Sequence, residues 1–338
     1  MEGGNHEPMK ILIYGAGVLG SLYAARIKES GQDISILARG KRLSDIQKYG
    51  IVMKNIYEEK ITTTPINVIE RLAEDDAYDL VIVIVRKNQL YSILPILSKN
   101  ENTPNVLFMG NNAKGPNGLI KDLGCDRVIM GFPGAGGTHE GHVIHYIDSS
   151  GPNRKRFKIT IGEIDGSLTI RLEKIKEMFE KAGIPVEINK NIDAWLKMHV
   201  ALVSPIANAI YMAGNDNYRL ARTQGGLVMM IRAIREGMRV LEELNFPIMP
   251  KKLKIFKWIP EPILVAFLRK KFNAKQIEMA TTKHALAARD EMKEIADEFK
   301  ELARKTSIPT PAIDNLYKYI DPDVPPIKDG SSEIPLKW

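Results

Sequence analysis

The 338-residue chain is long enough for two ordinary domains, and its 44% hydrophobic and 26% charged residues are typical of a soluble globular protein. It has no apolar segment of about 18 residues, which argues against a membrane-spanning helix, and residues 1–8 lack a secretory-signal pattern and are expected to form a flexible tail. The net charge of +7 favours anionic ligands, but no nucleic-acid-binding motif accompanies it, so nucleic acid is not an expected partner.

The first half alternates between short apolar segments rich in Val and Ile and segments with helical periodicity. Such apolar segments are typical of strands buried on both faces of a parallel sheet. The strands are expected at residues 10–14, 33–37, 79–85, 105–109 and 127–131, and the helices at 18–30, 42–49, 89–98 and 115–122. This alternation predicts an α/β fold with a doubly wound parallel (Rossmann) sheet.

Two shorter strands, residues 142–147 and 157–164, are expected to add antiparallel to the edge of that sheet, followed by a helix at 167–183 and a strand at 184–188. After about Asn189 the pattern becomes helical. Helices are expected at residues 191–214, 225–245, 273–306 and 311–320, with an irregular tail after them. Pro205 lies inside the first of these helices and is expected to kink it.

These patterns predict two domains after the tail. Residues 9–188 form the Rossmann domain, and residues 189–338 form an all-α domain for substrate binding and dimerisation.

Three glycines, Gly15, Gly17 and Gly20, form a GxGxxG motif between the first strand and the first helix. Gly15 permits the tight turn, Gly17 lets a pyrophosphate approach the backbone, and Gly20 lets the helix pack closely on the strand. The free N–H groups at the helix start would then hold the phosphates. The predicted cofactor-binding segment is Gly15, Ala16, Gly17, Val18, Leu19 and Gly20. The alternative is a tight turn that binds nothing.

The end of the second strand indicates which dinucleotide is bound. An NAD site usually has Asp or Glu there, which accepts a hydrogen bond from the ribose 2′-hydroxyl. This chain has Ala38 and Arg39, followed by Lys41 and Arg42. Because a guanidinium group can bind a 2′-phosphate in bidentate fashion, we predict NADP as the cofactor and Arg39 as its main contact. The alternative is that Arg39 only caps a surface loop.

Lys197 is the first candidate for the chemistry. It lies in the first turns of the helix at 191–214, among apolar neighbours. A lysine whose pKa is lowered by such surroundings suits the donation of a proton to a carbonyl oxygen during hydride transfer. From the residues alone, a solvated helix lysine remains the alternative.

No metal site is predicted. Cys125 is the single cysteine, so it has neither a disulfide partner nor a CxxC partner. His139, His142 and His145 lie on a strand and its approach, where His142 and His145 would face opposite sides. One cysteine agrees with a cytoplasmic location, which is the location that we expect.

The chain resembles the ketopantoate reductase (2-dehydropantoate 2-reductase) family over nearly its whole length, in residues 11–27, 106–115, 191–210 and 289–311. Members of that family have a Rossmann domain followed by an all-helical domain, bind NADPH and reduce a 2-oxo acid to a 2-hydroxy acid. The resemblance therefore implies this fold, this cofactor and this class of reaction for a small anionic substrate, and a homodimer is expected.

The resemblance also implies roles for four residues. Lys197 matches the catalytic lysine that protonates the ketone oxygen. Asn111 matches an asparagine that orients nicotinamide, lysine or substrate, although Asn112 replaces the glycine that follows it in the family. Glu291 matches an active-site glutamate that holds a polar group of the substrate or tunes the lysine. Arg86 stands where the type member has a cofactor-binding lysine. Asn111 satisfying a loop and Glu291 lying on a solvated helix face are the alternatives.

The family's substrate contacts are not all present. Ala201 and Pro205 stand where the type enzyme has asparagines, and Met279 where it has a serine. We therefore expect the reaction class to persist and the substrate to be a larger or more apolar oxo compound. New polar contacts could come from His199, Ser204, Asn208, His284 and Arg289.

Two other functions remain open from the sequence. One is a non-catalytic sensor of NADP(H), and the other is an opine- or hydroxyacid-type dehydrogenase that works in the oxidative direction. The segment at residues 250–272, basic at both ends with an apolar centre, could touch an anionic membrane, cover the substrate or form an ordinary helical hairpin.

Overall fold

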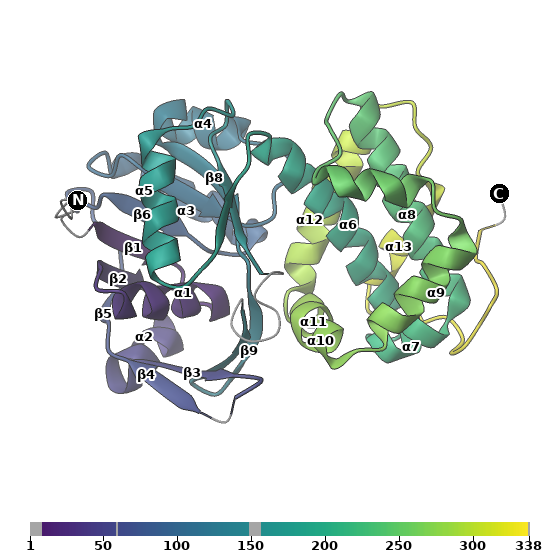
Figure 1. Cartoon of the computed structure of the whole chain (residues 1–338), viewed down its shortest axis with the longest axis horizontal. Coiled ribbons are helices and arrows are strands. Elements are labelled where there is room, and N and C mark those ends of the chain that lie inside the picture. The colour runs from purple at the N-terminus through teal and green to yellow at the C-terminus, as the bar shows by residue number, and fades with distance from the viewer. Residues whose placement is uncertain (1–8, 59, 149–156, 337–338) are drawn as a thin grey trace, which may run out of the picture. The chain divides into compact units, whose positions relative to one another are not determined.

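The computed structural model describes residues 9–58, 60–148 and 157–336, so the tail expected at residues 1–8 lies outside the described residues. The chain divides into two compact units, drawn together in Figure 1. The first unit comprises Met1–Gly110 and Pro116–Ile192, and the second comprises Asn111–Gly115 and Asp193–Trp338. The short segment Asn111–Gly115 therefore belongs with the second unit, although its neighbours in sequence belong to the first.

An eight-stranded sheet forms the centre of the first unit, with the strand order β12-β11-β8-β7-β6-β1-β2-β5. These strands are β1 (Lys10–Tyr14), β2 (Asp33–Leu37), β5 (Asn67–Ile69), β6 (Leu80–Val83), β7 (Val106–Met109), β8 (Val128–Phe132), β11 (Ile159–Gly162) and β12 (Val186–Ile188). All neighbouring pairs are parallel except β11 with β8. The strands β6 and β7 are buried throughout, as their apolar sequences require in a sheet covered on both faces.

Helices cover this sheet. They are α1 (Val18–Glu29), α2 (Gly40–Tyr49), α3 (Lys87–Lys99), α4 (Asn117–Leu123) and α5 (Ile170–Lys181), with a short helix η1 (Cys125–Arg127). α1 contacts α5 on one face, and α3 contacts α4 on the other (Figure 1). Tyr23 of α1 and Phe179 of α5 meet edge to face, with ring centroids 5.9 Å apart. The doubly wound Rossmann prediction is thereby confirmed.

A second sheet in this unit was not predicted. It has the order β4-β3-β10-β9 and consists of β3 (Ile51–Asn55), β4 (Ile61–Thr64), β9 (Gly136–Glu140) and β10 (Val143–Ile147), packed against α1. The prediction that residues 142–147 join the edge of the main sheet is wrong, because β10 pairs in parallel with β3 and antiparallel with β9. For residues 157–164 the antiparallel direction is confirmed, but β12, and not β11, lies at the edge.

The second unit is helical. Its elements are α6 (Ile192–Met212), α7 (Asn217–Arg222), α8 (Gln224–Glu243), η3 (Lys251–Lys257), α9 (Glu261–Phe272), α10 (Lys275–Ile277), η4 (Glu278–Thr282), α11 (Lys283–Ala287), α12 (Arg289–Ala303), α13 (Pro311–Tyr317) and η5 (Lys318–Ile320). α6 continues through Pro205. None of the helices in the described residues is both long enough and apolar enough to span a bilayer.

A buried carboxylate joins two of these helices. Glu236 of α8 is fully buried and accepts hydrogen bonds from the backbone N–H groups of Ala312 (3.0 Å) and Ile313 (2.9 Å). These donors lie in the first turn of α13, where a negative charge is favourable. Burial raises the pKa of Glu236, and the two hydrogen bonds oppose that rise. The carboxylate thus fixes α13 against α8.

The prediction of a single helix at residues 273–306 is wrong. The segment is divided among α10, η4, α11 and α12, and the last break lies at Ala288, whose backbone angles (φ −127°, ψ 39°) are outside the helical region. No Gly or Pro marks this break in the sequence. Arg289, directly after it, donates to the carbonyl oxygens of Tyr319 (3.3 Å) and Ile320 (3.0 Å), which indicates a structural role for this arginine.

Candidate functional site

In the glycine-rich turn between β1 and α1, each glycine is explained by a different feature of its surroundings. Gly15 has φ +123°, and a Cβ atom there would collide with the carbonyl oxygen of Ile84. A Cβ atom at Gly20 would collide with the carbonyl oxygen of Gly15, so α1 packs directly on the turn. At Gly17 a Cβ atom would meet no described atom within 4 Å. This position opens into free space, as a turn that receives a pyrophosphate requires.

The start of α1 is suited to an anion. Gly17 is the N-cap residue and provides no capping side chain, and the first turn contains no acidic residue. The first N–H groups of the helix are therefore not neutralised by a side chain of the cap, and the helix dipole adds positive potential there. The residues of this turn fit a dinucleotide phosphate.

Two arginines lie beside this turn. Arg39 is exposed and donates to the Tyr14 hydroxyl (3.1 Å). Arg42, in α2, donates from Nε to the carbonyl oxygen of Ala16 (3.1 Å) and from Nη2 to the Ser21 hydroxyl (3.2 Å). The sequence predicted Arg39 as the main cation, and the structure adds Arg42 as a guanidinium group bonded directly to the turn. Both can offer positive charge to a phosphate.

Arg86 is half-buried and lies at the N-cap position of α3. It follows Ile84, whose carbonyl oxygen lies against Gly15, by two residues. Arg86 therefore follows the end of β6, the strand next to β1, and lies close in sequence to Ile84, which touches the glycine-rich turn.

The three histidines of residues 139–145 have separate partners. His142 stacks on Tyr49 with ring centroids 4.3 Å apart, and His145 lies 3.2 Å from the Glu140 carboxylate. Burial, assisted by the nearby Arg42 charge, lowers the pKa of His139 to about 4. Within residues 9–58, 60–148 and 157–336, no group of three or more His, Cys, Asp or Glu side chains could hold a metal ion.

The segment Asn111–Gly115 is held within the second unit by two glutamates of α12. Asn111 donates from Nδ2 to Oε1 of Glu291 (3.1 Å). The N–H groups of Ala113 (3.1 Å) and Lys114 (3.2 Å) both donate to Oε2 of Glu298. Glu291 and Glu298 are seven residues apart, two helical turns, so they lie on the same face of α12. Both carboxylates are buried, which makes these hydrogen bonds strong constraints on the segment.

Within the segment, Asn112 forms a closed turn. Its side chain donates to the carbonyl oxygen of Gly115 (3.1 Å) and accepts from the N–H of Gly115 (2.9 Å). Gly115 has φ +86°, and a Cβ atom there would lie 3.0 Å from Nζ of Lys197. The segment that carries Asn111 therefore also contacts the predicted catalytic lysine.

Lys197 is only 3% exposed. Its ammonium group donates to the carboxylate of Asp193, one turn earlier in α6, and lies 4.6 Å from the ring centroid of Phe246. Burial lowers the pKa of Lys197, while Asp193 and Glu298 act in the opposite direction. The alternative of a solvated helix lysine does not hold, because the side chain is buried in an environment that disfavours its charge.

The structure thus brings Asn111, Lys197 and Glu291 into one unit and links them through a single five-residue segment. Glu291 lies in the first turn of α12 and is buried, so the alternative of a solvated helix face is also wrong. Oδ1 of Asn111 is buried without a hydrogen-bond partner among the described residues, which leaves one acceptor free at the centre of the cluster. Sequence reasoning missed Asp193 and Glu298. The available signal was their spacing in the sequence: Asp193 lies four residues before Lys197, and Glu298 lies seven residues after Glu291.

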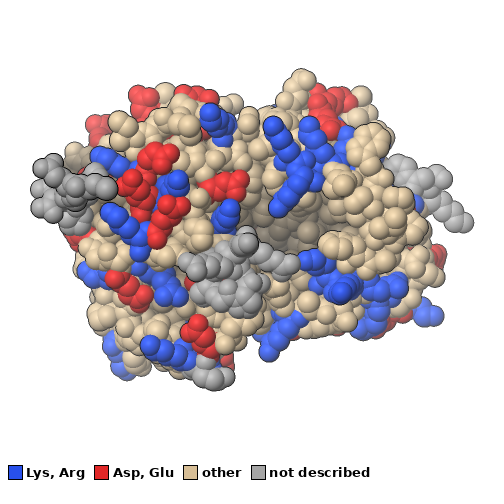
Figure 2. Space-filling view, viewed as in Figure 1, with Lys and Arg blue, Asp and Glu red and all other residues tan. Residues whose placement is uncertain are grey.

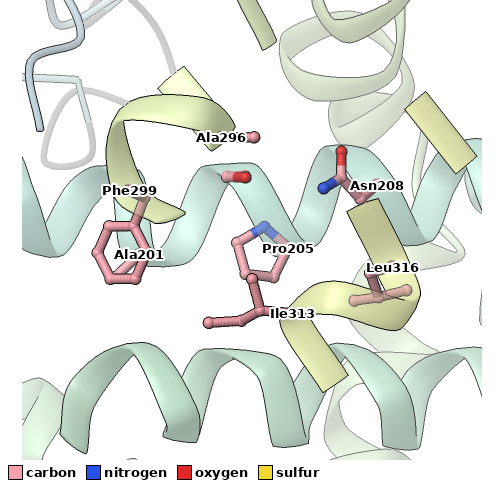
Figure 3. A pocket seen from close by; sticks show the side chains of 8 residues that line it. Ala201, Pro205, Asn208, Ala296, Phe299, Ile313 and Leu316 are labelled. Atoms are coloured by element: carbon pink, nitrogen blue, oxygen red, sulfur yellow. The ribbon is translucent and has the colours of Figure 1, made fainter. Parts of the chain in front are cut away.

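A small pocket lies in the same unit (Figure 3). α6 contributes Ala201, Ser204, Pro205 and Asn208, while α12 and α13 contribute only apolar side chains. Ala201 and Pro205, where the resemblance expects asparagines, do line a hollow, and their side chains offer it no hydrogen bond.

Of the five polar residues considered as replacements, Ser204 and Asn208 line this pocket. Asn208 is 3% exposed, and its Oδ1 has no hydrogen-bond partner among the described residues. His199 stacks on Trp195 with ring centroids 5.5 Å apart, and burial together with the charge of His284 lowers its pKa to about 4.

The first unit has the fold of nucleotide-binding α/β domains, with a glycine-rich turn and two arginines beside it. The second unit is helical and carries a buried lysine. Dehydrogenases and reductases that use a pyridine nucleotide combine these features. A model of the family "Ketopantoate reductase PanE/ApbA" matches residues 11–164. A 2-dehydropantoate 2-reductase of Pyrococcus horikoshii is 26% identical over 254 residues, which cover 73% of this chain and 79% of that protein.

Solved structures share the fold. The structure of 2-dehydropantoate 2-reductase from Geobacter metallireducens matches with a TM-score of 0.74 and 17% identity, covering 92% of this chain and 98% of that one. D-mandelate dehydrogenase in a ternary structure with NADH and anilino(oxo)acetate matches with a TM-score of 0.75 and 16% identity, covering 92% and 97%. The resemblance to the ketopantoate reductase family that the sequence predicted is confirmed by the family match over residues 11–164.

Proposed function

We propose that the protein is an NADPH-dependent reductase of a 2-oxo acid or a related ketone, with a substrate other than ketopantoate. The observation that carries the proposal is the buried Lys197, whose pKa is lowered and whose neighbours are held by the Asn111–Glu291 hydrogen bond. In this proposal the first unit binds the nucleotide and the second unit supplies the groups that act on the substrate, in a cytoplasmic homodimer.

When bound, the reduced nicotinamide supplies the hydride. Lys197 donates its proton to the ketone oxygen, and the lowered pKa of its ammonium group makes this donation easier. Asp193 and the 111–115 segment hold the lysine in place. Glu291 keeps the amide of Asn111 oriented, so that Oδ1, which has no partner among the described residues, can accept a hydrogen bond from a donor on the substrate or cofactor.

The preference for NADPH rests on Arg39 and Arg42. Both guanidinium groups lie by the glycine-rich turn, and the residues that end and directly follow β2 include no carboxylate to repel a 2′-phosphate. The Arg39→Asp variant is expected to lose at least tenfold in kcat/KM with NADPH and to gain relative activity with NADH. Unchanged discrimination between NADPH and NADH would contradict this assignment.

The preference for a less polar substrate rests on the pocket of the second unit. Ala201 and Pro205 offer no hydrogen bond, and α12 and α13 add only apolar side chains. Ser204 and Asn208 are the polar side chains of the lining, so a hydroxyl-rich substrate would find few partners there. The apolar side chain of an oxo acid suits this lining better.

The experiment that tests the function follows NADPH oxidation by its absorbance with a panel of 2-oxo acids whose side chains range from polar to branched aliphatic and aromatic. The proposal predicts turnover, with higher kcat/KM for the apolar members than for ketopantoate. Tight NADPH binding without turnover on any oxo acid would favour a sensor. Turnover only with NADP and 2-hydroxy acids or opines would favour an oxidative dehydrogenase.

A further inference from the structure

The positive charge of the protein is concentrated in one segment. Residues 251–275, here called the basic segment, contain eight Lys and Arg and one acidic residue, a net charge of +7. This equals the net charge of the whole chain, so the other residues are balanced, with 40 basic and 40 acidic. Figure 2 shows Lys and Arg side chains gathered on the second unit, with one group over α9 and few acidic side chains among them.

Most of the positive charges of the basic segment form no ion pair with the described residues, so they are available to an external partner. The one acidic residue, Glu261, is already paired with Arg232 (2.9 Å), and Lys257 is paired with Glu242 (2.5 Å). The exposed cations with no ion pair to the described residues are Lys251, Lys252, Lys254, Arg269, Lys270 and Lys275. A dense group of this kind attracts a polyanionic surface.

The same segment exposes large apolar side chains. Trp258 is 80% exposed, Ile255 63%, Ile263 59% and Phe267 55%. Ile263 and Phe267 are four residues apart, so they lie on one stripe of α9, and Nζ of Lys271 is 5.6 Å from the Phe267 ring centroid. Four such side chains within 13 consecutive residues exceed the scattered exposure that is normal on a protein surface.

The exposure of these side chains is not a sign of loose packing. The opposite face of α9 buries Leu264, Val265 and Phe272 in the core of the second unit. The segment before α9 is fixed by Arg235, which donates to the carbonyl oxygens of Phe256 (3.3 Å) and Ile259. The outward apolar side chains are therefore presented by an anchored scaffold.

We propose that the basic segment docks the protein onto an anionic lipid surface. Lysine and arginine side chains bind acidic headgroups, while Trp258, Ile255, Ile263 and Phe267 enter the boundary between headgroups and acyl chains, as amphipathic interfacial segments do. A second copy of the chain is disfavoured, because two such surfaces would repel each other. A nucleic acid is also disfavoured, since exposed Ile255 and Ile263 have no stacking or polar contact to offer it.

The test is co-sedimentation of the full-length protein with vesicles of phosphatidylcholine alone or of phosphatidylcholine with phosphatidylserine, at low and high salt. The wild type is expected to bind only the vesicles with phosphatidylserine, and salt is expected to weaken the binding. The combined variant Lys251→Glu, Lys252→Glu and Lys254→Glu is expected to lose at least about 100-fold in partition coefficient. Lys28→Glu, Lys121→Glu and Lys174→Glu together change the same charge on exposed lysines of the first unit and are expected to have a much smaller effect.

A second variant tests the apolar part. Trp258→Ser with Phe267→Ser is expected to weaken binding about tenfold without changing its salt dependence. Absence of binding to phosphatidylserine vesicles, or equal losses in the two lysine variants, would overturn the proposal. It would also be overturned if light scattering showed that Trp258→Ser with Phe267→Ser converts a dimer into monomers, or if a single-stranded oligonucleotide bound more tightly than the vesicles through the same lysines.

Discussion

Replacement of Glu298 tests whether the 111–115 segment is held as the structure shows. One buried oxygen of this carboxylate accepts from the N–H groups of Ala113 and Lys114. Hydrogen bonds to a charged group contribute about 1.5–3 kcal/mol each, and those between neutral groups about 0.5–1.5 kcal/mol. Glu298→Gln keeps a carbonyl oxygen in the same place, so we expect a loss of about 1–3 kcal/mol. Glu298→Ala leaves both N–H groups without an acceptor and is expected to cost about 3–5 kcal/mol.

The assay is urea unfolding followed by circular dichroism, combined with the pH dependence of the reduction rate. Glu301→Gln, an exposed position on the same helix, is the control and is expected to change stability by less than about 0.5 kcal/mol. Glu298 also raises the pKa of Lys197, so Glu298→Gln should move the alkaline decline of the rate to lower pH. If Glu298→Ala were as stable as the control variant, the two backbone hydrogen bonds could not hold the segment as described.

Two further perturbations follow from the same geometry. Gly20→Ala should prevent folding or lower the melting temperature strongly, because its Cβ atom collides with the carbonyl oxygen of Gly15. Gly17→Ala should fold normally and lose at least tenfold in NADPH affinity. Equal melting temperatures for the two variants, or unchanged NADPH affinity in Gly17→Ala, would contradict these expectations. If Lys197 is the proton donor, as proposed, the rate of reduction falls as pH rises through the pKa of this lysine. Because Asp193 raises that pKa, Asp193→Asn should move the decline to lower pH. A decline that stays in place or moves upward would contradict the donor role.

Much of the first unit was predictable from local sequence features. The apolar segments of β1, β2, β6, β7 and β8 and the glycines of the turn carry their own signals, because burial on both faces and close backbone contact restrict the residue types at those positions. The second sheet gave no such signal. The burial of β10 alternates along part of the strand, but nothing in its sequence tells that its partners are β3 and β9.

The candidate site was predictable only in part. Asn111 and Glu291 came only from a resemblance to a family. Lys197 was a candidate from its apolar neighbours as well, and its buried environment agrees with them. Glu298 was missed because it binds backbone N–H groups, which every residue except proline has, so sequence alone cannot show which ones it meets.

The central claim is that the buried ammonium group of Lys197 donates the proton during reduction. It is tested most directly by the rate of NADPH oxidation in Lys197→Ala with the best oxo acid of the panel, beside Lys174→Ala as an exposed control. The account predicts that the rate falls by about 10²–10⁴-fold in Lys197→Ala and stays unchanged in the control, with NADPH affinity preserved in both. A Lys197→Ala rate within about twofold of the wild type would contradict it, because general acid catalysis contributes far more than that.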